Sequence, residues 1–180
     1  MSTRLTLICH AATRATHSAW FPLDEPAEPM SLAKASRLAV APDQTLTSPA
    51  LRARQTADAM GLTADIDDAL RDIDLGSWAG QTLGDIQAAE PHAVTAWIAD
   101  PDAAPHGGES VAGLLLRMAP WLQAQRGSRV VAVTHAAVIR AAILLAIDAG
   151  PASFWRIDIA PLCRVELRGD GRRWTLRGIA

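Results

Sequence analysis

Short apolar runs alternate along the chain with longer segments whose apolar residues have helical spacing. Residues 4–9 and 129–134 are the clearest short runs, and the second is rich in valine, a β-branched residue typical of strands buried on both faces. Both runs stop abruptly at a histidine, His10 in one case and His135 in the other. We therefore predict two buried strands that each lead directly into a histidine.

The remaining segments continue this alternation of strands and helices. Further strands are expected at residues 45–47, 63–66, 154–159, 163–167 and 174–176. Helices are expected at residues 31–40, 48–60, 83–98 with an interruption at Pro91, from Glu109 or Ser110 onward, and at 136–147. Residues 11–30 contain helix-breaking prolines and are expected to form a loop. This order predicts an α/β fold of three layers, with a mostly parallel central sheet and helices on both faces.

Length and composition narrow the class of protein. A chain of 180 residues fits a single domain spanning 1–180. Hydrophobic residues make up 49% of the chain and charged residues 20%, which is enough apolar material for a core. The formal net charge of −2 argues against a dedicated nucleic-acid-binding protein. No basic run indicates attachment to an anionic membrane.

The cellular location follows from features that the sequence does not contain. The apolar run after the N-terminus is too short for a signal peptide, and no window approaches the length of a membrane span. Cys9 and Cys163 are far apart without a CxxC spacing, so they indicate neither a metal site nor an oxidising compartment. We expect a cytoplasmic protein, and the sequence does not indicate its oligomeric state.

His10 and His135 form the centre of the candidate chemistry. Ligands of open α/β sheets bind beyond the carboxyl ends of the strands, where both histidines are predicted to lie. A lone histidine after a strand is more often a packed or capping residue than a catalyst. Two at matching positions favour a shared pocket, in which one imidazole attacks phosphorus while the other donates a hydrogen bond to a phosphoryl oxygen.

Two further charged residues fit such a pocket. Arg52 lies in the first turns of a predicted helix, where a guanidinium can clamp phosphate through two parallel hydrogen bonds. Asp72 lies in an irregular segment, and its carboxyl group can protonate a leaving alcohol if its neighbours raise its pKa. Taken singly, each would be read as an exposed residue.

Five segments, taken in order, resemble the histidine phosphatase superfamily, which includes the phosphoglycerate mutases. They are LICHAAT at 7–13, SPALRARQTA at 48–57, LRDIDLGSWAG at 70–80, GES at 108–110 and VTHAAVIR at 133–140. The resemblance implies a phosphoglycerate mutase-like fold and a metal-independent, cofactor-free phosphohydrolase that acts on a small phosphate ester. It also implies that His10 is the phosphorylated nucleophile and Asp72 the general acid and later base. Arg52 and His135 would hold the phosphoryl group.

The departures from the family pattern lie at the pocket. Cys9 stands where the family has a phosphate-binding arginine, and Ala11 and Ala136 stand where it has glycines. Arg14, on the loop after the nucleophile, is the candidate replacement cation. Residues assigned to the pocket edge are Cys9, Ala11, Thr13, Glu109 and Ala136. Glu109 is equally explained as a helix-start residue that favours the helix dipole.

Two hypotheses follow from these residues. The first is a phosphohydrolase of a small phosphate ester, weakened by the missing arginine at position 9. The second is a catalytically silent protein of the same fold that binds a phosphorylated ligand or a partner protein. Residues 14–30 and part of 84–107, which match no motif, are expected to select the substrate.

Overall fold

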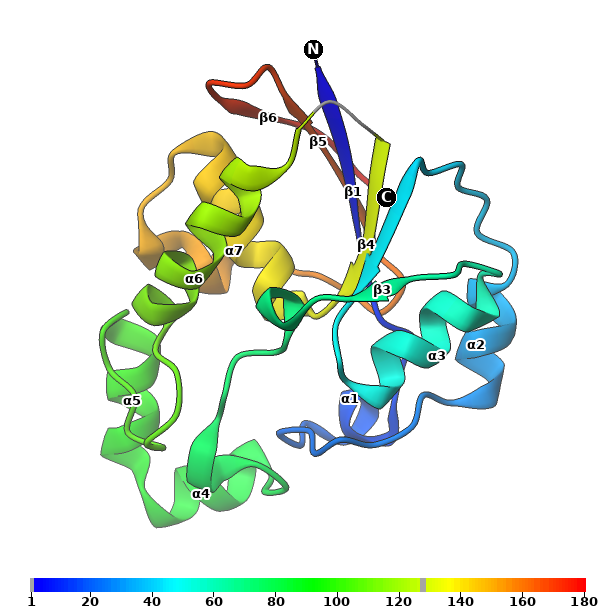
Figure 1. Cartoon of the computed structure of the whole chain (residues 1–180). Helices are drawn as coiled ribbons and strands as arrows, with labels where there is room; N and C mark the ends of the chain where they lie inside the picture. The colour runs from blue at the N-terminus through cyan, green and yellow to red at the C-terminus, as the bar shows by residue number, and fades with distance from the viewer. Residues whose placement is uncertain (1, 127–128) are drawn as a thin grey trace.

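A mixed sheet of six strands forms the centre of the computed structural model, which describes residues 2–126 and 129–180 (Figure 1). Residues 1 and 127–128 of the predicted domain lie outside the described residues. The strands are β1 (Thr3–Cys9), β2 (Gln44–Thr47), β3 (Asp65–Ile66), β4 (Arg129–Thr134), β5 (Arg164–Gly169) and β6 (Trp174–Ile179). They stand in the order β3-β2-β4-β1-β5-β6. Strands β1 to β4 are parallel to one another, whereas β5 runs antiparallel to β1 and β6.

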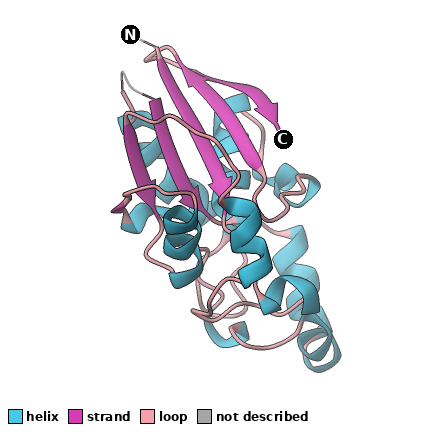
Figure 2. Ribbon diagram, turned by 90° about the vertical axis from the view of Figure 1, so that its right-hand side faces the viewer, coloured by secondary structure: helices cyan, strands magenta, loops and turns pink. Residues whose placement is uncertain are grey.

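Helices cover both faces of this sheet (Figures 1 and 2). The helices are α1 (Arg14–Ser18), α2 (Pro29–Ala35), α3 (Leu51–Ala59), α4 (Leu83–Ala89), α5 (Pro91–Ala99), α6 (Val111–Ala124) and α7 (Ala136–Ile147). Short 3₁₀ turns are η1 (Asp68–Leu70), η2 (Gly76–Trp78) and η3 (Pro151–Arg156). Side chains of β1 alternate between the faces: Leu5 and Leu7 join the core beneath α6 and α7, and Ile8 joins the core beneath α3.

The predicted fold class, a three-layer α/β/α arrangement with a mostly parallel sheet, is confirmed. Strand β4 and helix α7 begin and end at the predicted residues. The strand predicted at 154–159 is wrong, because this stretch begins within η3 and packs against α7. Phe154 is fully buried there, and Arg140 of α7 donates a hydrogen bond from Nε to the Ile157 carbonyl at 2.7 Å. The backbone is therefore tied to a helix and not to the sheet.

Two other local predictions also differ from the structure. The loop predicted at 11–30 contains the short helix α1, which ends at Ala19 in the left-handed conformation. The helix predicted at 48–60 begins instead at Leu51, with Ala50 at the cap position. The Ser48 side chain is used elsewhere, in a contact with His135.

The loop after Asp72 is hydrogen-bonded to the loop before α6, and this contact between residues 74–77 and 106–109 is called the loop crossing here. The Ser77 amide donates to the His106 carbonyl at 2.9 Å, and the Glu109 amide donates to the Asp74 carbonyl at 2.7 Å. Gly76 has a positive φ of 46°, and a Cβ placed on it would overlap the His106 carbonyl oxygen. The crossing therefore requires glycine, and it fixes the loop that follows Asp72.

Replacing Gly76 by alanine tests how tightly this crossing is packed. Gly107→Ala is the matched control, because Gly107 has a similar φ of 74° but nothing within 4 Å of the added Cβ. The control should lose about 1–2 kcal/mol of unfolding free energy from the left-handed backbone alone. Gly76→Ala should lose about 1–3 kcal/mol more through overlap. Equal losses in urea unfolding would show that the loops separate freely.

Candidate functional site

The two histidines meet because their strands are neighbours. β1 and β4 pair in parallel with Cys9 opposite Thr134, so the next residue of each strand, His10 and His135, lies at the same sheet edge. Their ring centroids are 5.1 Å apart, and the His10 amide donates to the Thr134 carbonyl at 2.8 Å. Both side chains are buried.

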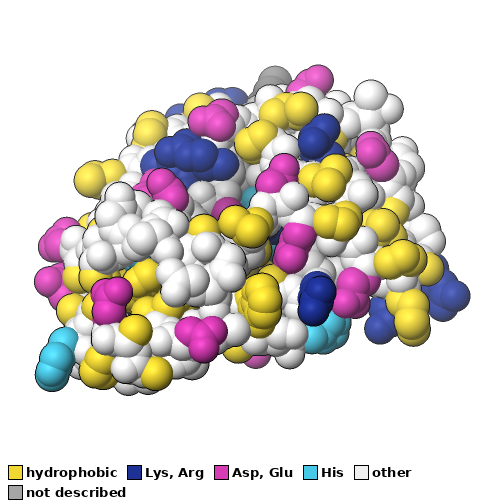
Figure 3. All heavy atoms as spheres, turned by 90° about the horizontal axis from the view of Figure 1, so that it is seen from below, with side chains coloured by type: hydrophobic (Ala, Val, Ile, Leu, Met, Phe, Trp, Pro, Cys, Tyr) yellow, Lys and Arg dark blue, Asp and Glu magenta, His cyan; other side chains and the backbone are white. Residues whose placement is uncertain are grey.

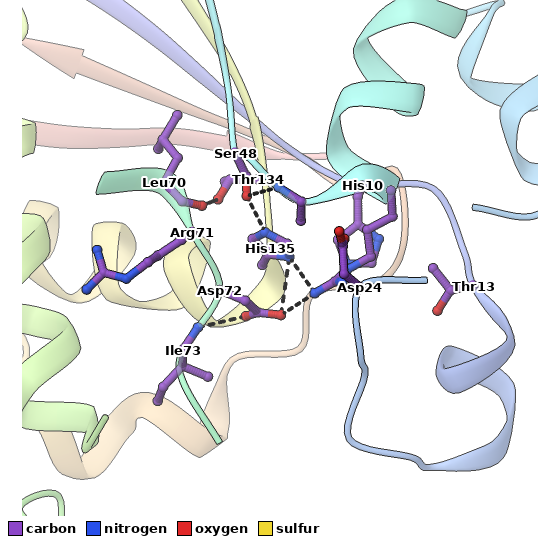
Figure 4. A network of polar contacts seen from close by, with 12 residues as sticks. His10, Thr13, Asp24, Ser48, Leu70, Arg71, Asp72, Ile73, Thr134 and His135 are labelled. Atoms are coloured by element: carbon purple, nitrogen blue, oxygen red, sulfur yellow. Dashed lines mark hydrogen bonds and ion pairs between the residues drawn. The ribbon is translucent and has the colours of Figure 1, made fainter. Parts of the chain in front are cut away.

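Arg52, in the first turn of α3, connects the site, in which the side chains of Asp72 and His135 lie next to each other (Figure 4). Its Nε donates to His10 Nε2 at 3.2 Å, and its Nη2 lies 2.8 Å from Asp72 Oδ2 and 3.2 Å from His135 Nδ1. Its Nη1 donates to the Leu23 carbonyl at 3.0 Å. The guanidinium is buried, and its charge is balanced by the Asp72 carboxylate. The structure therefore brings together the four residues that the sequence assigned to phosphate chemistry.

The hydrogen bonds of His10 indicate which of its two ring nitrogens carries the proton. Nδ1 lies 2.8 Å from the Ala11 carbonyl, which can only accept, so Nδ1 carries the proton. Nε2 then bears the lone pair that accepts from Arg52. Burial, the neighbouring His135 and the Arg52 cation lower the pKa of His10 from 6.5 to about 4. At neutral pH, His10 is an uncharged imidazole with its nucleophilic nitrogen directed at Arg52.

His135 is held by a residue that the sequence analysis missed. Its Nε2 lies 2.7 Å from the Ser48 hydroxyl, which also accepts from the Ala50 amide at 3.2 Å. Ser48 comes directly after β2, the other parallel neighbour of β4. Its position at a strand end was a signal available in the sequence, but a serine followed by proline is equally typical of a helix start.

The segment around Asp72 is fixed by its neighbours on both sides. Arg117 of α6 donates from Nη1 to the Ala69 carbonyl at 2.6 Å and pairs with Glu109 at 2.7 Å. The hydroxyl of Thr134 donates to the Leu70 carbonyl at 2.7 Å. Glu109, assigned from the sequence to the pocket edge, thus contacts a cation that holds the backbone ahead of Asp72.

The protonation of Asp72 differs from the sequence-based expectation. Burial by itself raises the pKa of this carboxyl group, but the charge and hydrogen bond of His135 and the charge of Arg52 act in the opposite direction. The net effect holds the pKa of Asp72 well below its usual range. In this state Asp72 is a carboxylate, and it needs a change in its surroundings to act as an acid.

Cys9 is the last residue of β1 and comes directly before His10. The side chain is buried, and burial, followed by Asp72 and Cys163, raises the pKa of Cys9 from 9.0 to about 12. A thiol with that pKa stays protonated at neutral pH and is a poor nucleophile. Cys9 is therefore a small apolar residue in this structure.

The other residues assigned from the sequence lie around this centre. Arg14 is exposed at the first residue of α1, and the hydrogen bonds of the described residues do not join it to His10. Thr13 is buried beside α1, with its amide bonded to Thr16, and lies away from the network in Figure 4. The Ala11 amide donates to Thr56 at 2.9 Å. Ala136 borders the cavity described next.

A cavity of about 170 Å³ opens beside His10 and Asp72. Its lining is mostly apolar and comprises Phe21, Ile73, Leu75, Trp97, Ala136, Ala137, Phe154 and Trp155, together with His10, Asp72 and Arg140.

A second, more open depression of about 390 Å³ borders Arg52, Ser48 and Asp72. When the molecule of Figure 1 is seen from below, hydrophobic and acidic side chains lie among one another in the middle of the face (Figure 3). A larger cavity of about 450 Å³ lies far from the histidines, near Trp174, so size alone does not mark the site.

Two features of other classes of protein were sought in the described part of the chain. No group of three or more histidine, cysteine, aspartate or glutamate side chains there is arranged to hold a metal ion. Among the same residues, no helix combines the length and apolar character needed to cross a bilayer.

Sequence comparison finds relatives among mycobacterial proteins. The bifunctional protein Rv2228c of Mycobacterium tuberculosis is 32% identical over 136 residues, covering 70% of this chain but only 37% of that protein. The chain thus spans well under half the length of that relative. A glucosyl-3-phosphoglycerate phosphatase of Mycolicibacterium vanbaalenii is 35% identical over 111 residues, 56% of this chain and 49% of that protein.

Solved structures show the same architecture. The mycobacterial glucosyl-3-phosphoglycerate phosphatase Rv2419c superposes with a TM-score of 0.84 at 26% identity, covering 98% of this chain and 97% of that one. A phosphoserine phosphatase from Entamoeba histolytica shares the fold with a TM-score of 0.86 at 19% identity, over 98% and 96% of the two chains. The sequence profile of the histidine phosphatase superfamily (branch 1) matches residues 5–180. The chain therefore belongs to the histidine phosphatase superfamily.

Proposed function

We propose that this protein hydrolyses a small phosphate monoester through a phosphohistidine on His10, without a metal ion or cofactor. The observation that carries the proposal is the arrangement of His10 Nε2, Arg52 and His135 Nδ1 around one point, with Asp72 beside it. Relatives are named as phosphatases of glucosyl-3-phosphoglycerate and of phosphoserine, and these names support a phosphatase activity in this protein.

The first step transfers the phosphoryl group. His10 Nε2 attacks phosphorus, the bond from phosphorus to the ester oxygen breaks, and the leaving oxygen takes a proton from Asp72. The guanidinium of Arg52 stabilises the negative charge on the phosphoryl oxygens. Arg52 Nε contacts His10 Nε2 directly, so the phosphate has to replace this contact.

The same replacement prepares Asp72 to act as an acid. A bound phosphate places negative charge beside the carboxylate and takes up donors of Arg52 that now lower the pKa of Asp72. Both changes raise the pKa of Asp72, because a like charge disfavours its ionised form. In the second step a water molecule attacks the phosphohistidine, Asp72 accepts its proton, and inorganic phosphate leaves from a regenerated His10.

Replacing the nucleophile is the direct test of the proposal. His10→Ala should lower kcat/KM for a general phosphatase substrate by about a thousandfold or more, because no nearby group replaces Nε2. His92→Ala, which removes an exposed histidine of α5, is the matched control and should keep wild-type activity. Mass spectrometry of quenched wild-type protein should find the phosphoryl group on His10. Equal activity of wild type and His10→Ala would contradict the phosphohistidine mechanism, and a lack of activity in the wild type would support the catalytically silent hypothesis.

The protonation state of His10 gives a second test. Its Cε1–H resonance should titrate with a midpoint near pH 4 instead of 6.5, with His10→Gln used to assign the signal. The unfolded chain binds this proton more tightly than the native state, so unfolding free energy should fall as pH drops from 6.5 to about 4. His10→Gln should lose less stability over that range. A midpoint at or above 6.5 would contradict a neutral, buried imidazole.

The role of Cys9 is tested by removing its sulfur. Cys9→Ala should keep kcat/KM within about twofold of wild type, because a buried protonated thiol is not a nucleophile. Cys163→Ala, at the half-buried second cysteine, controls for small packing changes. Activity assays at pH 7 and 8 give the comparison, and a large loss in Cys9→Ala alone would assign chemistry to the thiol.

A further inference from the structure

The cavity beside His10, called here the aromatic cavity, is built from rings that come from distant parts of the chain. Phe21 comes from the loop after α1, Trp97 from α5, and Phe154 and Trp155 from η3. The Trp97 and Trp155 ring centroids are 4.4 Å apart, and those of Phe21 and Trp97 are 5.6 Å apart with near-perpendicular planes. Rings packed against each other in this way form a rigid apolar wall.

The size of the aromatic cavity limits what it can hold. Its volume is about 170 Å³. An apolar protein cavity of about 150 Å³ binds one benzene molecule. The aromatic cavity therefore has room for one six-membered ring beyond the phosphate, and His10 and Asp72 lie in its wall where the ester bond must be.

Arg140 gives this wall a preference for aromatic over saturated groups. Its guanidinium carbon lies 5.7 Å from the Phe154 ring centroid and 5.8 Å from that of Trp155. Nε donates to the Ile157 carbonyl, whereas the two terminal nitrogens make no hydrogen bond within the described ranges 2–126 and 129–180. A cation in an apolar wall attracts the face of an additional ring through its quadrupole.

A sugar or polyol leaving group fits this wall poorly. Its several hydroxyl groups would lose water against the tryptophan and phenylalanine rings and find few partners there. Besides the indole N–H groups of Trp97 and Trp155, the polar side-chain groups of the lining belong to His10, Asp72 and Arg140, and His10 and Asp72 are already assigned to the reaction. The wall thus disfavours the hydroxyl-rich groups that many phosphate esters carry.

We propose that the leaving group of the natural substrate is a single aromatic ring carried on or next to the ester oxygen, as in an aryl or arylmethyl phosphate. The phosphate lies at His10, Arg52 and His135, and the ring lies in the aromatic cavity against Trp155 and Arg140. This inference rests on the proposed phosphohydrolase function and names the class of its substrate.

Three alkyl phosphates isolate the contribution of the ring. Benzyl, cyclohexylmethyl and ethyl phosphate all release a primary alcohol, so their intrinsic reactivities are similar. We expect kcat/KM for benzyl phosphate to exceed that for ethyl phosphate by at least about tenfold, with cyclohexylmethyl phosphate between them. Similar values for benzyl and ethyl phosphate, within about twofold, would overturn the proposal.

Substitutions of two tryptophans test whether the aromatic cavity causes the preference for benzyl phosphate over ethyl phosphate. Trp155→Leu should reduce the ratio of benzyl to ethyl phosphate turnover by about tenfold, because it removes one ring of the wall. Trp174→Leu is the matched control, since Trp174 is also half-buried but borders the distant cavity near α6 and α7. It should leave the ratio unchanged. A ratio that stays at the wild-type value in Trp155→Leu would also overturn the proposal.

Binding separates this proposal from the proposed hydrolysis. Calorimetry with His10→Ala should show tighter binding of benzyl phosphate than of ethyl phosphate, whether or not the wild-type protein turns either over. If the protein binds benzyl phosphate more tightly than ethyl phosphate but the wild type hydrolyses neither, the proposed hydrolysis is contradicted. The proposed binding of an aromatic ring in the cavity is then kept. If hydrolysis depends on His10 but neither binding nor rate favours benzyl over ethyl phosphate, the proposed role of the aromatic cavity is contradicted. The proposed hydrolysis is then kept.

Discussion

One buried guanidinium, that of Arg52, contacts His10, His135 and Asp72 at once, and the arrangement of the site follows from it. A charge removed from water needs hydrogen bonds and a counter-charge, and each contact of Arg52 supplies one of these. The same cation helps to keep His10 neutral and Asp72 ionised. His10 and Asp72 therefore share this cation as one influence on their protonation, alongside burial and the neighbouring His135.

The scaffold around this cation combines sheet pairing with loop contacts. Parallel pairing of β1 and β4 places the two histidines side by side, and α3 carries Arg52 over them. Asp72 has no strand to hold it. It is positioned through the Glu109–Arg117 pair, the Thr134 hydroxyl and the glycine crossing at Gly76. A loop residue thus acquires a defined position through contacts made by three separate elements.

The two sides of His10 differ in character. Arg52 makes a charged contact with His10, whereas the aromatic cavity that His10 also borders has a mostly apolar lining. Arg140, which reaches this cavity from α7, is the cation there. Under the proposed function, phosphate binding and leaving-group recognition fall on two different surfaces of one site.

Local sequence was enough to predict the elements that a strong pattern defines. The valine-rich run of β4, the apolar helix α7 and the motif residues at the strand ends predicted the fold class and the four residues of the network. Where two structures compete for the same pattern, sequence alone was insufficient. Residues 154–159 look like a strand, but residues 154–156 belong to the 3₁₀ turn η3, which packs against α7. Ser48 looks like a cap but contacts His135.

The sequence by itself determined which chemical groups are present and which strand ends carry them. Only the tertiary structure decided their protonation, because the pKa values of His10 and Asp72 depend on burial and on charges from distant segments. It also decided that Phe21, Trp97 and Trp155, which belong to no motif, form a wall beside His10. Contacts between residues far apart in the chain leave no local pattern, since each ring looks like ordinary core until its neighbours are known.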